Sequence, residues 1–202
     1  MSRAEWEWLP RLSIPGEKPD LCYQMNRALA EAKGEVIIFL QDHIEINPGA
    51  LQRIWELYQS NPNVAVTFPV GKRNGESVSW DWRAFWEDHL DKSEITYERF
   101  EIDFAMIPRT LLAKVLDHDG YFFDEGFDSG FGYDNVEIAY RMSKLGVKFF
   151  VSSAIRGVAF DHDRFEPHPY KPRGNQDLWI VKQGLIDLNY GGDGIDQTLD
   201  TP

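Results

Sequence analysis

The chain has 202 residues, and its 33 acidic and 21 basic side chains give a formal net charge of −12. This length suits one domain with a substantial hydrophobic core, and the acidic balance argues against a nucleic-acid backbone as a partner. Cys22 is the only cysteine, which excludes an intrachain disulfide and favours a reducing compartment such as the cytoplasm.

The apolar residues form no segment suited to a membrane. Residues 1–10 lack the apolar core of a signal peptide. No apolar run reaches the roughly 20 residues that a membrane helix needs. We therefore expect neither a signal peptide nor a membrane span.

The first half of the chain alternates between helical and extended patterns. Apolar spacing predicts a helix over 21–33, and the run Val36–Leu40 is typical of a strand that is buried on both faces. A second amphipathic helix over about 50–60 and a strand over 64–68 follow. This order predicts an α/β fold with a mostly parallel, twisted sheet flanked by helices.

The second half continues the alternation. Expected strands cover 102–107, 148–152 and 155–160, and expected helices begin at Pro108, Asp134 and Asn175. Residues 1–190 are therefore assigned to one domain, and the acidic, Gly-rich residues 191–202 to a disordered tail.

Polar side chains follow the strand Val36–Leu40 directly. Gln41, Asp42 and His43 stand at its carboxyl end, where open α/β sheets bind ligands. Carboxylates and imidazoles both ligate divalent cations. The alternative is a solvated loop between a strand and the next helix.

An aromatic cluster lies in the middle of the chain. Trp80, Trp82 and Trp86 are close together among charged residues. Such indoles suit a platform for the flat face of a sugar, that is, for an acceptor. The alternative is that they cover the core, as large aromatic side chains commonly do.

A second polar stretch joins a Gly-rich aromatic loop to a helix. Tyr133 precedes Asp134, Asn135 and Glu137 in the expected first helical turn. Acids at this position commonly serve only as partners of the helix dipole. Farther on, a polar loop carries the last candidate residues, His162, Lys171 and Arg173.

Together these stretches resemble the GT-A glycosyltransferases, especially family 2 and the polypeptide N-acetylgalactosaminyltransferases. The helix and strand over 26–40 resemble the segment that leads to the family's metal motif. Gln41-Asp42-His43 stands where the family has Asp-x-Asp or Asp-x-His. Residues 123–127 and 132–141 resemble its acceptor-side block. The resemblance covers roughly residues 20–165.

The resemblance implies a sugar transfer from a nucleotide-sugar donor to a carbohydrate or protein acceptor, with Mn²⁺ or Mg²⁺ as cofactor. A divalent cation neutralises the charge of the departing nucleoside diphosphate. The implied metal ligands are His43, Asp42 and His162, and the implied donor-binding residues are Asn26, Gln41, Lys171 and Arg173. The implied catalytic residues are Asp134 and Asn135, and the implied acceptor contacts are Trp80, Trp82, Trp86, Tyr133 and Glu137.

Three departures from the family pattern accompany this resemblance. Gln41 replaces the first Asp of the metal motif, and Asn135 replaces the Asp that inverting members use as a general base. Because an amide cannot accept a proton, Asp134 takes that role or the reaction needs no base. The stereochemical outcome therefore stays open. The family's N-terminal nucleotide-binding block is not visible, so the fold is expected to be N-terminally shortened, with a second chain as one source of the missing half.

Two other function classes fit parts of the sequence. A non-catalytic carbohydrate-binding or assembly module derived from this fold is compatible with Gln41 and Asn135. A metal-dependent hydrolase built on Asp42, His43 and His162 is less favoured, because the sequence supplies no separate base to activate water.

Overall fold

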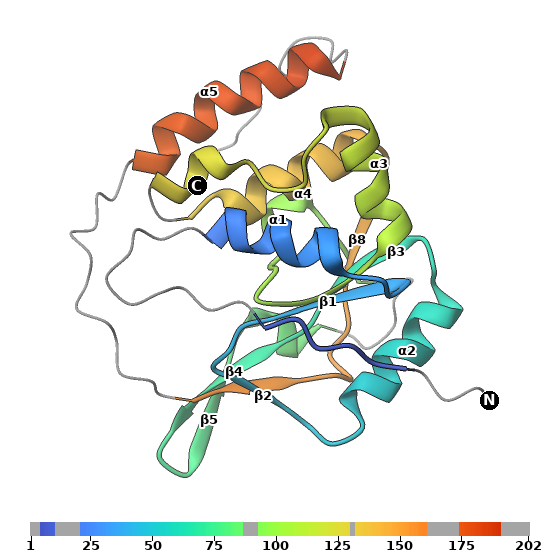
Figure 1. Cartoon of the computed structure of the whole chain (residues 1–202). Coiled ribbons are helices and arrows are strands. Elements are labelled where there is room, and N and C mark those ends of the chain that lie inside the picture. The colour runs from blue at the N-terminus through green and yellow to red at the C-terminus, as the bar shows by residue number, and fades with distance from the viewer. Residues whose placement is uncertain (1–4, 11–20, 87–92, 130–131, 161–173, 191–202) are drawn as a thin grey trace.

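The computed structural model describes residues 5–10, 21–86, 93–129, 132–160 and 174–190 (Figure 1). They form two β-sheets and five α-helices. The helices are α1 (Leu21–Glu31), α2 (Ala50–Ser60), α3 (Arg109–Asp119), α4 (Asp134–Lys144) and α5 (Gly174–Asn189). Among the described residues, no helix combines the length and apolar character needed to cross a membrane.

The larger sheet has five strands in the order β1-β7-β3-β8-β6. Their bounds are β1 (Val36–Leu40), β7 (Phe104–Pro108), β3 (Val64–Thr67), β8 (Lys148–Val151) and β6 (Glu94–Ile95). The α/β fold class is confirmed, but the expectation of a mostly parallel sheet is wrong. Of the seven strand pairings among the described residues, only β3 with β8 and β4 with β9 are parallel.

The insertion of β7 explains the mixed directions. β1 and β3 are joined through α2, and both run antiparallel to β7, so they are parallel to one another as a βαβ unit requires. They are not neighbours, because β7 lies between them. β1 is consequently at the edge of the described sheet, and all five of its residues are half-buried rather than buried on both faces.

The smaller sheet has the order β2-β9-β4-β5. Its strands are β2 (Ile44–Ile46), β9 (Gly157–Ala159), β4 (Val70–Asn74) and β5 (Ser77–Trp80). β4 and β5 form a hairpin whose turn includes Gly75 with a φ of 61°. The aromatic region from residue 77 therefore begins as a strand, which the sequence pattern did not predict.

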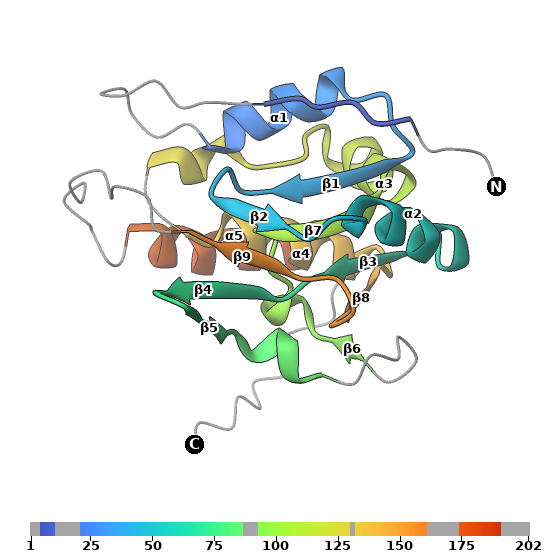
Figure 2. The same cartoon turned by 90° about the horizontal axis from the view of Figure 1, so that it is seen from below.

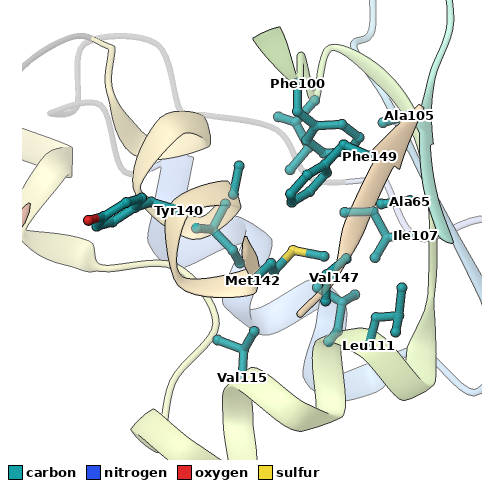
Figure 3. Packing of buried hydrophobic residues seen from close by; sticks show 14 of the residues in the cluster. Ala65, Phe100, Ala105, Ile107, Leu111, Val115, Tyr140, Met142, Val147 and Phe149 are labelled. Atoms are coloured by element: carbon teal, nitrogen blue, oxygen red, sulfur yellow. The ribbon is translucent and has the colours of Figure 1, made fainter. Parts of the chain in front are cut away.

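Helices cover both faces of the larger sheet (Figures 1 and 2). α1, α3, α4 and α5 lie on one face, where Ala65, Ala105, Ile107 and Phe149 project into a common core (Figure 3). α2 packs on the other face, where Ile54 contacts a second core that includes Val66, Phe104 and Met106. The alternating residues of β7 thus enter two different cores, and all five are buried.

The helix predictions agree closely with the structure. α1 begins where expected and ends at Glu31, before Gly34. α2 ends at Ser60, and α4 begins at Asp134 as predicted. α5 matches the expected final helix. The predicted tail over 191–202 lies outside the described residues, and the boundary at 190 stays a prediction.

Candidate active site

Polar residues gather where β1 and β3 end and β7 begins. The backbone N–H of Gln41 donates to the carbonyl of Asp103 at 3.0 Å, and that of Phe68 donates to the carbonyl of Phe104 at 2.9 Å. These bonds bring the residues after two strands alongside the residue before a third. The candidate site therefore lies at the edge of the larger sheet where β1 has its carboxyl end, and its role in ligand binding stays a prediction.

A cavity of about 460 Å³ opens at this edge, between the loop after β1 and the smaller sheet. Of the predicted site residues, the structure brings His43 and Trp80 together here. The full lining is His43, Val70, Gly71, Lys72, Ser79, Trp80, Asp81, Asp103, Ala159 and Phe160. The cavity thus combines an imidazole, carboxylates, one lysine and two aromatic rings.

Of the predicted metal motif, His43 lines this cavity and Asp42 does not. Nδ1 of His43 lies 3.4 Å from Oδ1 of Asp42, and the His43 side chain is 25% exposed, against 85% for Asp42. No group of three or more His, Cys, Asp or Glu side chains in the described part of the chain is placed to hold a metal ion. The donor set therefore fits a divalent cation only with further ligands, and the predicted third ligand, His162, lies outside the described residues.

A buried guanidinium fixes the wall of the cavity. Arg83 is 3% exposed and donates from Nη1 and Nη2 to the two carboxylate oxygens of Asp103, at 2.7 and 2.9 Å. Its Nε and Nη2 also donate to Asp81, and Nη1 donates to the hydroxyl of Thr67 at 2.8 Å. Burial alone would lower the pKa of Arg83, but the hydrogen bonds and charges of these carboxylates outweigh burial and raise it. We call Arg83, Asp81, Asp103 and Thr67 the Arg83 cluster.

The Arg83 cluster also anchors the hairpin. Asp81 accepts from the backbone N–H of Val70 at 2.9 Å and from that of Arg83 at 2.9 Å. It therefore ties the start of β4 to the short 3₁₀ helix Trp82–Phe85. This local structure presents Trp80 and Lys72 to the cavity.

Gly71 leaves room for the indole of Trp80. The two residues face each other across β4 and β5, and a Cβ added at Gly71 would lie 2.9 Å from Cε3 of Trp80 and 2.4 Å from a methyl group of Val78. The guanidinium carbon of Arg156 lies 5.0 Å from the centre of the Trp80 ring, on which it stacks. The indole is thus held between a glycine and a cation.

We expect Gly71→Ala to destabilise the protein by about 1–3 kcal/mol, because the new methyl group overpacks against Trp80 and Val78. Urea unfolding measures this loss. The matched control is Gly184→Ala in α5, where an added Cβ meets open space; there the same substitution should stabilise by about 0.5–1 kcal/mol. Equal effects of the two substitutions would contradict the packing of Trp80 against Gly71.

The other two predicted platform residues do not line this cavity. Trp82 and Trp86 form an edge-to-face pair with ring centres 6.2 Å apart, and Arg99 stacks on Trp82 at 5.6 Å. Trp86 packs against the main core. Trp82 is 36% exposed, so part of its indole is accessible to a ligand. Its role as an acceptor contact stays a prediction.

The predicted catalytic pair begins α4, outside the lining of the cavity. Burial raises the pKa of Asp134, although the backbone N–H groups of Asp134 and Asn135 donate to its carboxylate and oppose that shift. Nδ2 of Asn135 donates to Oε2 of Glu101 at 3.1 Å. Glu101 lies two residues before Asp103, so this pair and the cavity wall belong to the same edge of the larger sheet.

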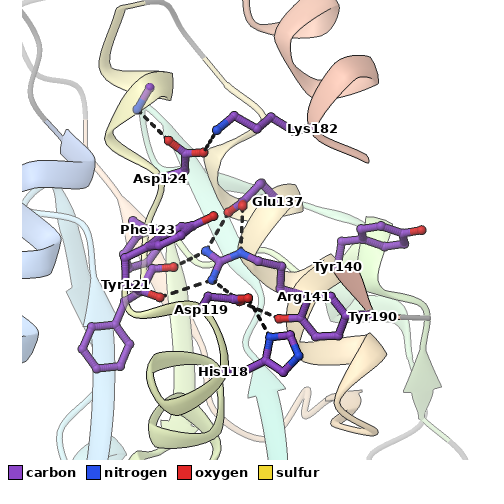
Figure 4. Close-up of polar contacts among 12 residues, drawn as sticks. His118, Asp119, Tyr121, Phe123, Asp124, Glu137, Tyr140, Arg141, Lys182 and Tyr190 are labelled. Carbon is purple, nitrogen blue, oxygen red and sulfur yellow. Dashed lines mark hydrogen bonds and ion pairs between the residues drawn. The ribbon is translucent and has the colours of Figure 1, made fainter. Parts of the chain in front are cut away.

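The structure contradicts the predicted acceptor contact of Glu137. This residue is fully buried, and its two carboxylate oxygens accept from Nε and Nη2 of Arg141 at 2.7 and 2.8 Å (Figure 4). Arg141 also donates to Asp119 at 3.0 Å and stacks on Tyr121. The sequence pattern placed Glu137 in the first helical turn as an acceptor contact, whereas in the structure α4 contacts both α3 and α5. We call Arg141, Glu137 and Asp119 the Arg141 cluster.

Tyr133 and Asn26 lie outside the lining of the cavity. Tyr133 precedes α4 with a φ of 69°, a left-handed conformation that is rare for a residue with a side chain. The amide of Asn26 donates to the carbonyl of Phe123 at 2.9 Å, and its oxygen accepts from the N–H of the same residue at 2.9 Å. Asn26 therefore fastens α1 to the segment before α4, and it lines a smaller hollow of about 270 Å³.

The remaining predicted residues divide into two groups. The side chain of Gln41 is exposed, and its backbone is anchored to Asp103. Lys171 and Arg173, like His162, lie outside the described residues. Asp42 and Asp134 do not share either of the two cavities described here.

Sequence reasoning missed the residues of the Arg83 cluster and Glu101. A signal was present for one of them, because Asp103 interrupts an otherwise apolar stretch at the start of an expected strand. No comparable signal marks Arg83: Asp81 is its neighbour in sequence, but Thr67 and Asp103 reach it only through the fold.

Comparisons with known proteins agree with this architecture. The family model described as glycosyl transferase family 2 matches residues 14–122, which is more than half of the chain. None of the curated proteins matches the chain.

Two solved structures share its fold. TarS (residues 1–349) from S. aureus in complex with UDP-GlcNAc is similar with a TM-score of 0.56 and 14% identity over 91% of this chain and 50% of that chain. GalNAc-T7 with UDP, GalNAc and Mn²⁺ is similar with a TM-score of 0.55 and 14% identity over 84% of this chain and 35% of that chain. The chain thus spans half or less of the length of these structures, and its fold is that of the GT-A glycosyltransferases. On the match of the family model, the chain belongs to glycosyl transferase family 2.

Proposed function

We propose that the chain catalyses the transfer of a sugar from a nucleoside-diphosphate donor to a carbohydrate or protein acceptor. The observation that carries this proposal is the cavity at the carboxyl end of β1, where His43 of the family's metal motif faces Trp80 and Lys72. TarS was solved with UDP-GlcNAc and GalNAc-T7 with UDP. A uridine nucleotide is therefore the first donor class to test.

His43 and Asp42 are the residues that would hold Mn²⁺ or Mg²⁺. Their donor atoms are neighbours, and imidazole nitrogen with carboxylate oxygen suits Mn²⁺. Phe160 donates its backbone N–H to the carbonyl of His43 at 3.0 Å, which brings the chain beside His43 two residues before His162. When bound, the ion would supply a Lewis acid that neutralises the charge of the departing diphosphate.

The other side chains of the cavity have complementary roles. The face of the Trp80 indole suits the apolar face of a sugar ring. Lys72 lines the same cavity and offers a cation to a phosphate oxygen. In an otherwise acidic protein, this cation and the predicted contacts of Lys171 and Arg173 would attract the donor's negative charge.

The edge position of β1 supports the proposal that further strands complete the donor site. Within the described residues β1 pairs with β7 alone, and its residues Val36–Leu40 are apolar and half-buried. A strand added beside β1 would lie next to the metal motif. The second chain predicted as the source of a nucleotide-binding half stays a prediction.

The test is calorimetric titration of the chain with UDP in the presence of Mn²⁺. We expect binding that weakens by more than about 10-fold in His43→Ala, since even the loss of a group that supports a metal ligand costs 10–100-fold. His118→Ala is the matched control, because His118 is paired with Asp119 and is not part of the cavity lining. Unchanged binding in His43→Ala would contradict the proposed metal site.

One further candidate function has an observation in its favour. Gln41 and Asn135 replace two carboxylates of the family pattern, as expected for a carbohydrate-binding module that has lost catalysis. Saccharide binding at Trp80 without any UDP binding, by a protein that is folded by circular dichroism, would favour this module over the transferase.

A further inference from the structure

Asn135 stands where the family resemblance places a general base, yet an amide cannot accept a proton. Its Nδ2 donates to Oε2 of Glu101 at 3.1 Å. We propose that Glu101 is the carboxylate that takes the proton from the acceptor hydroxyl. This inference rests on the proposed glycosyl transfer and identifies a catalytic residue that the sequence motifs did not contain.

The fold holds Glu101 at the site edge. Its backbone carbonyl accepts from the hydroxyl of Thr67 at 2.7 Å, and that hydroxyl accepts from Nη1 of Arg83 at 2.8 Å. Through these bonds Glu101 is continuous with the Arg83 cluster, which contributes Asp103 and Asp81 to the cavity lining. Its backbone is thus tied to the cavity wall, and its carboxylate contacts Asn135 at the start of α4, outside the cavity lining.

The surroundings of Glu101 suit a general base. Partial burial raises the pKa of Glu101, as do the negative charges of Asp103, Asp81 and Asp134, while Arg83 opposes the shift. A raised pKa makes a carboxylate a stronger proton acceptor near neutral pH. The charges that act on Glu101 thus come from three sides: Asp103 just before β7, Arg83 and Asp81 from the 3₁₀ helix and its N-cap, and Asp134 from α4.

Asp134 is less suited to the same task. The backbone N–H groups of Asp134 and Asn135 donate to its carboxylate, which directs that carboxylate toward the first turn of α4. Burial raises the pKa of Asp134 as it does that of Glu101, so the two residues differ in what their carboxylates contact. The carboxylate of Asp134 is therefore taken up by the first turn of α4, while Asn135 orients Glu101.

The proposed transfer is a single displacement at the anomeric carbon of the donor sugar. The acceptor oxygen forms a bond to the anomeric carbon of the donor sugar, and its proton passes to Glu101. The bond from the anomeric carbon to the phosphate oxygen breaks, and its electron pair leaves with the nucleoside diphosphate. The donor is a nucleoside-diphosphate sugar, the acceptor is a hydroxyl compound, and no oxidant or reductant is required.

The test compares Glu101→Gln with the wild-type 202-residue chain in a transfer assay with UDP-sugars, Mn²⁺ and a panel of saccharide and peptide acceptors. A Gln oxygen still accepts the hydrogen bond from Asn135, so folding and UDP affinity should be preserved. We expect kcat to fall by about 100- to 10,000-fold, the usual contribution of a general base. The wild-type rate should also fall at acidic pH as Glu101 becomes protonated, and this acidic limb should be absent from the residual rate of Glu101→Gln.

Two further variants separate catalysis from structure. The double variant Glu101→Gln with Asn135→Asp moves the carboxylate across the same hydrogen bond and should recover at least about 10-fold of the lost kcat. Glu94→Gln is the matched control, because Glu94 forms an exposed ion pair with Lys148. Its kcat should equal that of the wild type.

The outcomes distinguish this inference from the function on which it rests. Wild-type transfer that persists unchanged in Glu101→Gln would overturn the role of Glu101 and leave the transferase standing. A folded wild-type chain that neither binds UDP nor transfers any sugar would overturn the transferase, and the role of Glu101 with it.

Discussion

Arg83→Met is expected to destabilise the protein by about 3 kcal/mol, because it leaves the carboxylates of Asp81 and Asp103 without their shared cation. Removing one partner of a buried ion pair typically costs 3–5 kcal/mol, and the lower end applies because these two carboxylates are 27% and 24% exposed. Urea unfolding followed by circular dichroism measures the loss.

Two control variants show how much of the effect comes from the several hydrogen bonds of Arg83 and how much from its charge alone. Arg83→Lys keeps the cation but cannot donate to two carboxylates and to Thr67 at once, so it should lose an intermediate amount of stability. Lys148→Met breaks an exposed ion pair with Glu94 and should change stability by less than about 1 kcal/mol. If Arg83→Met is no worse than Lys148→Met, the Arg83 cluster does not hold the hairpin in place.

Arg141→Met should be at least as damaging, with an expected loss of about 3–5 kcal/mol. Arg141 is 1% exposed, and both oxygens of Glu137 accept from it inside the protein (Figure 4). The same guanidinium donates to Asp119 and to the carbonyls of Tyr121 and Phe122. One substitution therefore leaves a buried charge and several buried acceptors without a donor.

The loss in Arg141→Met should shrink as the pH falls. Burial raises the pKa of Glu137 even in the presence of Arg141, whose hydrogen bonds oppose the shift. Without Arg141 that pKa rises further, so the folded state binds a proton that the unfolded state releases at the same pH. Stability of the variant should therefore increase from pH 7.5 toward the unfolded pKa of Glu, about 4.3.

A double variant provides the control for this cluster. Arg141→Met with Glu137→Met removes the buried charge together with its partner and should recover part of the lost stability, since an apolar pair of similar volume is often tolerated. Urea unfolding at several pH values measures both effects. A deficit in Arg141→Met that stays constant with pH, or a double variant that is worse, would show that Glu137 is not the uncompensated charge.

Most helices and strands could be predicted from local sequence patterns. Sequence spacing predicted the helices Leu21–Glu31 and Ala50–Ser60, and apolar runs predicted β1 and β3. These patterns could be recognised because each depends only on neighbouring residues. The strand that pairs with β1, and the direction of that pairing, could not be predicted from local patterns. They depend on β7, which comes some 60 residues later and enters the sheet between β1 and β3.

The site shows the same division between local and long-range information. His43 was identifiable because it directly follows a strand, and the structure places it at the cavity. Glu137 was misassigned because its spacing in α4 did not reveal that α3 and α5 cover that face. Arg83 and Glu101 were missed because Thr67 and Asp103 lie 16 and 20 residues from Arg83, and Asn135 lies 34 residues from Glu101. These contacts form only in the folded protein.

The positions of β8 and β9 have a consequence for biosynthesis. β8 lies between β3 and β6, and β9 lies between β2 and β4, so each sheet needs a strand from residues 148–159 to join its parts. Until Ala159 has left the ribosome, the edge of Val64–Thr67 that pairs with β8 remains unpaired in the nascent polypeptide. Over the same period β2 remains separate from the β4–β5 hairpin, because β9 has not yet joined them. Closure over such long separations is slow, and the exposed strands in the meantime are the surfaces that chaperones bind.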